Sequence, residues 1–203
     1  MKKDVLQREQ LPAWFAAVQQ AQNPVIAAYL QIMLLTGARP GEVLGLRWED
    51  VNTKWKGISI RDKVEGTREI PANALCAATC WPPCPAAMNG CFSSPTSADR
   101  PPDRAEQCPH PRLSKLPGWT GLTLHGLRRS FKSLTEWLEM PAGVVAQIMG
   151  HKPSATAEKH YTVRPLDLLR LHHEKIEAWI LEQAGVAFDA QAAPGALRVV
   201  TAA

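Results

Sequence analysis

The feature that most limits how this chain can fold is a segment of 49 residues, 72–120, in which neither a helical nor a strand period is present. The segment holds all five cysteines and more than half of the 17 prolines. Proline removes a backbone donor and blocks regular structure, so a segment this rich in proline predicts neither helix nor sheet. A core must therefore be assembled from the two flanking parts, residues 1–71 and 121–188.

The part before this segment predicts two helices followed by two strands. Asn23–Pro24 is a good helix start, with a capping side chain and then proline at the first helical position. Gly37 ends this helix, and a shorter one is predicted over 40–46. Residues 57–60 and 67–70 resemble two short strands of a hairpin. The apolar residues of the first helix follow helical spacing: Val25, Ile26, Tyr29, Leu30, Met33 and Leu34.

The part after the segment is helical in pattern. A first apolar stripe consists of Leu127, Phe131, Leu134 and Leu138. A short helix over 141–149 is closed by Gly150, and another short helix leads into Tyr161. Pro165 opens a long amphipathic helix through about Ala184, and we expect the tail 189–203 to be flexible. One side of the long helix carries Leu169, Ile176, Trp179 and Ile180. Together with the hairpin, these helices predict an α+β fold, mainly α with a small antiparallel β-sheet.

Charge and hydropathy leave several classes of partner open. The net charge is +4 and the pI is about 8.9, which permits nucleic-acid binding without requiring it. The first residues are polar, and no apolar run reaches the length that crosses a membrane. We therefore expect a cytoplasmic protein that has no membrane partner.

At three places in the sequence, titratable or charged residues lie beside residues that begin or end a predicted helix. Arg39 lies in the tight turn between the two predicted helices. His125 and Arg128 open a predicted helix at its N-terminus, the end that attracts phosphate. His151 follows Gly150 and precedes Tyr161 by ten residues. Taken singly, each has an ordinary explanation as a surface arginine, a helix cap or a loop histidine.

Taken together, two arginines, two histidines and a tyrosine are what metal-free phosphodiester transfer requires. Guanidinium groups stay charged and match phosphate oxygens with paired donors. Histidine moves protons near neutral pH, and a tyrosine hydroxyl becomes a better nucleophile beside cations. Of the two tyrosines, Tyr29 lies within an apolar helical run and is expected in the core. Tyr161 is therefore the candidate nucleophile.

The order and approximate spacing of these residues resemble the signature of the tyrosine recombinases, or phage integrases, in their catalytic domain. The similarity rests on the strings Thr36-Gly37-Ala38-Arg39-Pro40-Gly41-Glu42-Val43, Leu46-Arg47-Trp48, His125-x-x-Arg128 and Met149-Gly150-His151, then Tyr161. It leaves the proline-rich segment unmatched. The interval from His151 to Tyr161 is one residue longer than the commonest spacing in the family.

The resemblance implies a role for each residue in DNA cleavage and rejoining. Tyr161 would attack a DNA phosphate to give a 3′-phosphotyrosyl link. Arg39 and Arg128 would hold the phosphate, and His125 and His151 would assist with hydrogen bonds and proton transfer. The resemblance implies no cofactor, no metal and no small-molecule substrate.

Two further residues take supporting roles by the same resemblance. The family uses a hairpin lysine as general acid toward the leaving 5′-oxygen, and Lys63, just before the predicted turn at Glu65–Gly66, is the candidate. The other interpretation of Lys63 is a solvated hairpin charge. Glu42 would support the arginine turn without taking part in the chemistry.

The resemblance also implies partners. These are double-stranded DNA and a second copy of the chain, which would dock through the long C-terminal helix. The alternative for that helix is packing on its own domain. Family members also carry an N-terminal domain that completes a clamp around DNA, and this chain begins close to the catalytic domain.

The segment 72–120 has two interpretations. Cys80, Cys84, Cys91, Cys108 and His110 suggest zinc, although their spacing fits no ordinary pair of ligand knuckles. The favoured interpretation is a frameshift, because plausible codons read in a shifted frame give apolar and strand-like peptides similar to those of related integrases. We then expect no folded functional insert here. An inactive integrase remnant that at most binds DNA is the alternative function.

Overall fold

The computed structural model describes residues 4–21, 24–52, 54–62, 66–72, 119, 121–151 and 164–187. The expectations for Lys63, Tyr161, the short helix before it, most of segment 72–120 and the tail 189–203 lie outside these residues. In the described part of the chain, no helix is long and apolar enough to cross a membrane.

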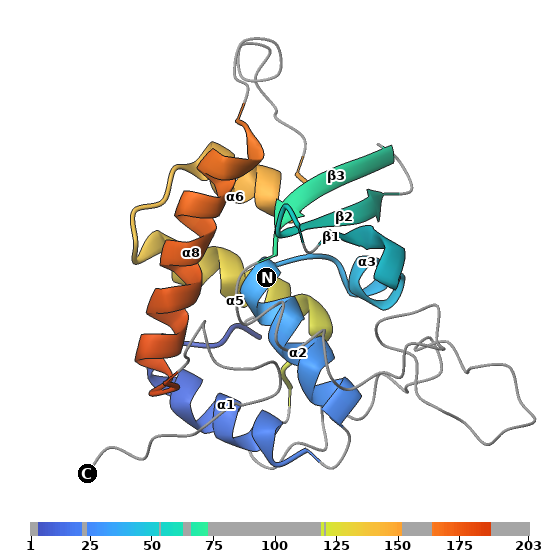
Figure 1. Ribbon diagram of the computed structural model, residues 1–203. Helices are drawn as coiled ribbons and strands as arrows, with labels where there is room; N and C mark the ends of the chain where they lie inside the picture. The colour runs from blue at the N-terminus through green and yellow to red at the C-terminus, as the bar shows by residue number, and fades with distance from the viewer. Residues whose placement is uncertain are drawn as a thin grey trace, which may run out of the picture.

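The elements confirm the predicted class, mainly α with a small antiparallel sheet (Figure 1). In chain order they are η1 (Arg8–Gln10), α1 (Leu11–Gln19), α2 (Pro24–Thr36), α3 (Pro40–Leu44), η2 (Trp48–Asp50), β1 (Val51–Asn52), β2 (Gly57–Asp62), β3 (Gly66–Pro71), α5 (Leu124–Glu136), α6 (Ala142–Met149) and α8 (Leu166–Gln183). The predicted helix 40–46 is shorter than expected and ends at Leu44.

The sheet has the order β1-β2-β3, and both pairs are antiparallel. Ile58 pairs with Ile70, and the register continues to the pair Asp62 and Gly66 at the hairpin end. Ile58, Ile60 and Ile70 are each about 1% exposed, so one face of the sheet is fully covered. Figure 1 shows the sheet beside α3, with the start of α8 close to β3.

The parts before and after the proline-rich segment share one core. α2 packs against α5, and α8 packs against both α1 and α2. Trp14 of α1, Met33 of α2, Phe131 of α5 and Ile176 of α8 are all fully buried in it. Tyr29 is also buried, as predicted, and its hydroxyl donates to the Pro40 carbonyl at 3.3 Å.

The apolar side of α8 faces its own domain. Leu169, Ile176 and Ile180 are buried in the core, and Trp179 is half-buried. The expectation that this side docks on a second copy is therefore wrong for the three buried residues, because the core of the same chain covers them.

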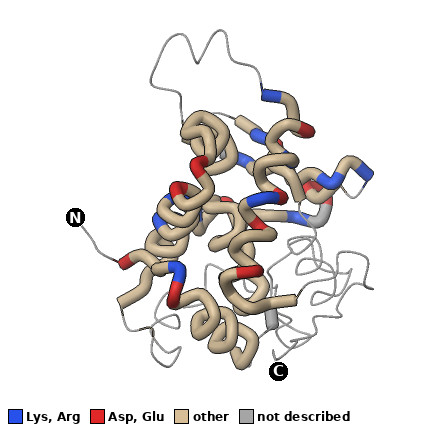
Figure 2. Tube along the Cα trace, turned by 90° about the vertical axis from the view of Figure 1, so that its left-hand side faces the viewer, with Lys and Arg blue, Asp and Glu red and all other residues tan. Residues whose placement is uncertain are grey.

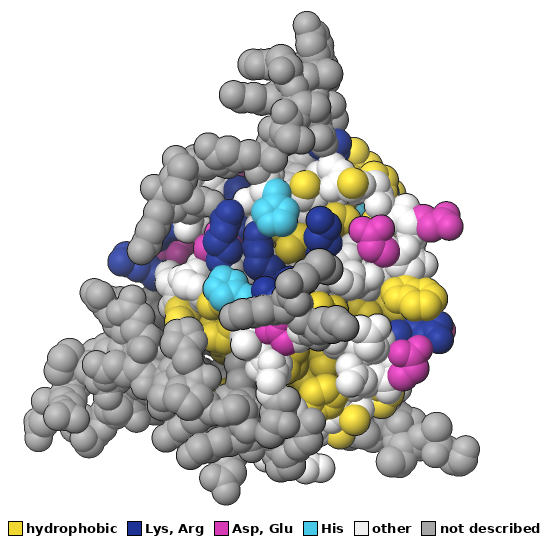
Figure 3. All heavy atoms as spheres, turned by 180° about the vertical axis from the view of Figure 1, so that it is seen from behind, with side chains coloured by type: hydrophobic (Ala, Val, Ile, Leu, Met, Phe, Trp, Pro, Cys, Tyr) yellow, Lys and Arg dark blue, Asp and Glu magenta, His cyan; other side chains and the backbone are white. Residues whose placement is uncertain are grey.

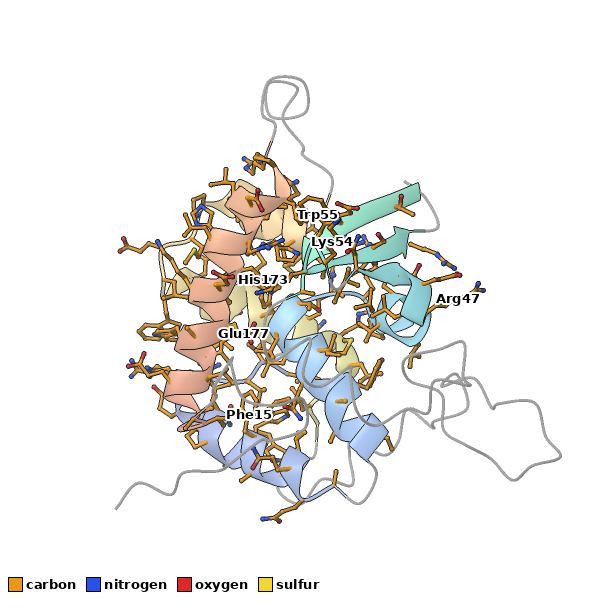
Figure 4. The ribbon with its side chains drawn as sticks, in the orientation of Figure 1. Phe15, Arg47, Lys54, Trp55, His173 and Glu177 are labelled. Atoms are coloured by element: carbon orange, nitrogen blue, oxygen red, sulfur yellow. The ribbon has the colours of Figure 1, made fainter. Side chains whose placement is uncertain are left out.

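Two polar residues one turn apart lie on the buried side of α8, and they are His173 and Glu177 (Figure 4). His173 Nε2 lies 2.8 Å from the Leu35 carbonyl oxygen, to which it donates, and the imidazole packs edge-on against Phe131. Burial lowers the pKa of His173, so the ring is neutral at pH 7.

The first described residues are fastened across α5. The backbone N–H of Leu6 donates to Ser130 Oγ at 2.8 Å. The carboxylate of Asp4 accepts hydrogen bonds from Thr123 and Arg129, which flank the first turn of α5. This end of the chain is thus tied directly to the helix that carries His125 and Arg128.

Gly37 provides a test of the packing between α2 and α5. Its φ is +59°, and a Cβ placed there would lie 2.4 Å from Phe131 Cδ1. Gly37→Ala should therefore lower the free energy of unfolding by about 2–4 kcal/mol, measured by urea denaturation. Gly41 is the control, because in the described part of the chain no atom outside its local backbone and chain neighbours lies within 4 Å of its Cβ position. Gly41→Ala should be neutral or stabilise by about 0.5 kcal/mol. Equal losses in both variants would contradict the packing described here.

Candidate basic site

The turn between α2 and α3 presents Arg39. Thr36 ends α2, where its hydroxyl donates to the Ile32 carbonyl at 2.7 Å and accepts from the Ala38 N–H at 3.2 Å. Gly37 then takes a left-handed backbone conformation that L side chains rarely adopt. Arg39 is the N-cap of α3, and Pro40 follows as its first residue.

Glu42 and Gly150 orient the Arg39 side chain. Arg39 Nη1 lies 2.6 Å from Glu42 Oε1, and the Arg39 backbone N–H donates to Oε2 at 2.8 Å. Arg39 Nη2 donates to the Gly150 carbonyl oxygen at 3.1 Å. The Arg39 side chain remains 42% exposed although Glu42 and Gly150 hold its guanidinium.

The first turns of α5 carry His125 and Arg128. The Thr123 hydroxyl caps the helix by accepting from the Gly126 N–H at 3.0 Å. Arg128 is buried, and its Nη1 donates to the Gly37 carbonyl oxygen, which fastens α5 to the turn that presents Arg39. His125, one turn earlier, is exposed.

His151 lies where α6 ends. Gly150 closes α6 with a left-handed φ of 71°, and the His151 N–H donates to the Ala146 carbonyl at 2.8 Å. Partial burial lowers the pKa of His151, and the charges of Arg128, Lys132, Arg39 and Arg68 lower it further.

These five residues, Arg39, Arg68, Arg128, Lys132 and His151, form what we call the basic cluster. Figure 3 shows histidine side chains beside lysine and arginine side chains on one face of the molecule. Elsewhere on the trace, acidic and basic residues are interspersed (Figure 2). The cluster is therefore a local arrangement, and the small net charge of +4 does not account for it.

Two members of the basic cluster were not predicted from the sequence. Lys132 follows Arg128 by four residues and His125 by seven, so helical spacing places all three on one side of α5 and was a usable signal. Arg68 lies on β3 and reaches the cluster only through the packing of the sheet against α3, for which the sequence gives no local signal.

The chemistry of the basic cluster is that of an anion site. Guanidinium groups from separated segments bind a phosphate with paired donors and need little rearrangement to do so. Among the residues that the structure describes, no three of His, Cys, Asp or Glu are grouped as metal ligands.

Sequence comparison finds relatives of one kind. A model of the phage integrase family matches residues 4–80. The prophage integrase IntF of Escherichia coli (strain K12) is 48% identical over 198 residues, which covers 90% of this chain and 40% of that protein. The chain thus spans less than half the length of this curated relative.

Structural comparison finds the same fold in solved recombinases. The crystal structure of XerA recombinase has a TM-score of 0.58 at 18% identity, covering 84% of this chain and 64% of that one. The Tn1549 transposon integrase in complex with circular intermediate DNA has a TM-score of 0.56 at 20% identity, with coverages of 82% and 63%. A lambda integrase dimer bound to a core site has a TM-score of 0.56 at 15% identity, with coverages of 81% and 62%.

The pKa of His151 provides a test of the basic cluster. We expect His151 to titrate below the ordinary value of 6.5, because burial and the neighbouring cations disfavour its charged form. The ring is then neutral at pH 7 and gains a proton only as the pH falls below its lowered pKa. An NMR titration measures this, with His151→Gln to assign the signal. Sodium sulfate should raise the pKa more than sodium chloride of equal ionic strength. A His151 pKa that lies at the ordinary value and does not change with sulfate would contradict the basic cluster.

Proposed function

We propose that this chain is a tyrosine recombinase catalytic domain of the phage integrase family, and that it cleaves and rejoins DNA strands in site-specific recombination. The observation that carries the proposal is the gathering of Arg39, Arg128 and His151, from three separated segments, around one position in a chain with the signature spacing.

In the proposed reaction, the phenolic oxygen of Tyr161 attacks a phosphorus atom of DNA. A bond forms between that oxygen and phosphorus, and the bond between phosphorus and the 5′-oxygen breaks. The proton that Tyr161 loses is balanced by one that the 5′-oxygen gains. Rejoining runs the same steps in reverse with the 5′-hydroxyl of another strand, so no nucleotide is consumed.

Arg39 and Arg128 stabilise the charge that develops on the non-bridging oxygens in this proposal. Electrostatic stabilisation by groups already in position is the main catalytic contribution in phosphoryl transfer. Arg39 suits a direct contact because Glu42 and Gly150 support its guanidinium while its side chain is still 42% exposed. Lys132 adds a positive charge that a neighbouring DNA phosphate offsets.

The remaining residues transfer protons or donate a hydrogen bond. His151, with its lowered pKa, is neutral at pH 7 and can accept the proton of the Tyr161 hydroxyl. His125, exposed at the start of α5, donates a hydrogen bond to the phosphate. Lys63 protonates the leaving 5′-oxygen. We assign these roles from the signature positions, and Lys63 and Tyr161 lie outside the described residues.

We further propose that residues 1–71 and 121–188 are the two halves of one catalytic domain, separated by the frameshift-derived segment 72–120. Their common core supports the single domain. Because the chain spans 40% of its prophage relative, the double-stranded DNA partner and the recombination activity are proposals for this chain. A mobile element as the source and the cytoplasm as the site of action belong to the same proposal.

The first test is covalent attachment to DNA. The protein should form an adduct with a nicked half-site, seen as a shifted band on a denaturing gel. Tyr161→Phe removes the attacking oxygen and should abolish the adduct, with DNA affinity unchanged within about twofold. Arg39→Ala or Arg128→Ala should slow its formation by about 10²–10³-fold.

Tyr29→Phe is the matched control, because Tyr29 is the other tyrosine of the chain and its hydroxyl is buried against Pro40. This variant should keep the adduct. An adduct that persists in Tyr161→Phe would contradict the nucleophile. An unmodified protein that binds DNA and forms no adduct would support the inactive-remnant alternative.

We propose that a second copy of the chain docks on the outward side of α8. Leu168 and Leu171 are 39% and 52% exposed there, at a spacing that continues toward Trp179. Trp179 also lines a groove of about 550 Å³ together with Leu138 and Met140. This outward stripe replaces the face of Leu169, Ile176 and Ile180, which is buried in the core of the same chain.

The test of this contact is sedimentation on DNA that carries two half-sites. The unmodified chain should bind as more than one protomer. Leu171→Glu should raise the concentration needed for the second protomer about tenfold, because it places a charge in an apolar contact. Gln19→Glu adds the same charge at an exposed position of α1 and should have no effect. Equal effects of both variants would contradict docking through α8.

A further inference from the structure

The carboxylate of Glu42 is shared between two arginines. Arg68 Nη1 and Nη2 donate to Oε1 and Oε2 at 3.0 and 2.7 Å. Arg39 donates to the same two oxygens, through Nη1 at 2.6 Å and through its backbone N–H at 2.8 Å. Each oxygen therefore accepts one hydrogen bond from each arginine residue. Glu42 can hold Arg39 in one orientation because Arg68 holds Glu42 from the other side.

The two arginines differ in what they expose. The side chain of Arg68 is 16% exposed and that of Glu42 is 7% exposed, whereas that of Arg39 is 42% exposed. Burial raises the pKa of Glu42, but the hydrogen bonds from Arg68 and Arg39 lower it overall, so the carboxylate is ionised at neutral pH. A buried carboxylate that lost the paired hydrogen bonds of Arg68 would be poorly compensated, and its geometry would relax.

Arg68 also supports the turn that carries His151. A Cβ on Gly150 would lie 2.5 Å from Arg68 Cζ and 2.6 Å from Nη1, so the guanidinium occupies the space that a side chain would need. The carbonyl oxygen of the same glycine accepts from Arg39 Nη2 at 3.1 Å. The Arg68 guanidinium thus packs against the Gly150 turn before His151 and also pairs with Glu42, the carboxylate that orients Arg39.

We propose that Arg68 is a positioning residue that orients Arg39 through Glu42 and supports the Gly150–His151 turn. The inference rests on the proposed function and adds a residue that the family signature in this sequence did not single out. Within the basic cluster, Arg68 acts through Glu42, because both of its Nη atoms donate to that carboxylate. Arg39 makes the contact with phosphate.

The experiment compares Arg68→Lys and Arg68→Gln in adduct formation on a nicked DNA half-site. Both variants should slow cleavage by roughly 10–100-fold, the effect of losing a charged, paired hydrogen bond. DNA affinity should change by less than about threefold, because the Arg68 guanidinium donates to Glu42 and its side chain is only 16% exposed. Lysine should not rescue, because a point charge cannot replace a two-donor fork. Rescue by lysine, or an affinity loss as large as the rate loss, would overturn the proposal.

The control is Arg61, which lies on the neighbouring strand β2. Its side chain is 45% exposed and pairs with Glu49 and Asp50, away from Glu42. Arg61→Gln should leave the cleavage rate unchanged. Adding Glu42→Gln to Arg68→Gln should slow cleavage little beyond the slower single variant, because both substitutions remove the same Arg68–Glu42 interaction. Fully multiplied effects would show that Arg68 does not act through Glu42.

A measurement without catalysis separates this inference from the proposed function. If the unmodified chain forms no adduct, the proposed function fails, and the NMR signal of the Arg39 Nε–H group still reports on positioning. In the unmodified protein this signal should be resolved and slow to exchange with solvent. Arg68→Lys should shift it and speed its exchange, with the thermal unfolding transition retained. An Arg39 signal that is identical in both proteins would refute the positioning role.

Discussion

Repulsion between like charges is the constraint on which the rest of this structure depends. Arg39, Arg68 and Arg128 would separate if nothing held them, and the fold offsets their repulsion with one buried carboxylate, Glu42, and the carbonyl oxygens of Gly37 and Gly150. The Arg39 side chain remains 42% exposed within this arrangement.

A rigid body is needed to keep those acceptors in place. The α2, α5 and α8 helices provide it through a core in which Phe131 and Ile176 are fully buried. His173, neutral within that core, joins α8 to the end of α2 by its hydrogen bond to Leu35. The turn with Arg39 begins immediately after this point, so the packing of α8 bears on the site although α8 contributes no residue to the basic cluster.

The sequence predicted those parts of the fold that local rules decide. Proline at the first position of α2 and glycine after the last position of α6 set the helix ends through backbone geometry alone, and both helices have bounds close to the expected ones. α1 was not predicted, although Leu11, Trp14, Phe15 and Val18 have helical spacing and are buried. Which surface covers an amphipathic helix depends on the whole fold, so the sequence could not decide between the two interpretations of α8. The signature singled out Arg39, Arg128 and His151, but the contact of Arg68 with Glu42 arises only when the sheet packs on α3.

The attachment of Asp4 and Leu6 to α5 has a mechanical consequence. Thr123 and Arg129 hold Asp4 at the first turn of the helix, and Ser130 holds Leu6 one turn further along. Tension applied to the chain ahead of Asp4 would load these bonds in shear and reach the first turn of α5 without passing through a slack loop. His125 and Arg128 are part of that segment of helix. A pull from that side would therefore exert a torque on the segment of α5 that carries these two residues.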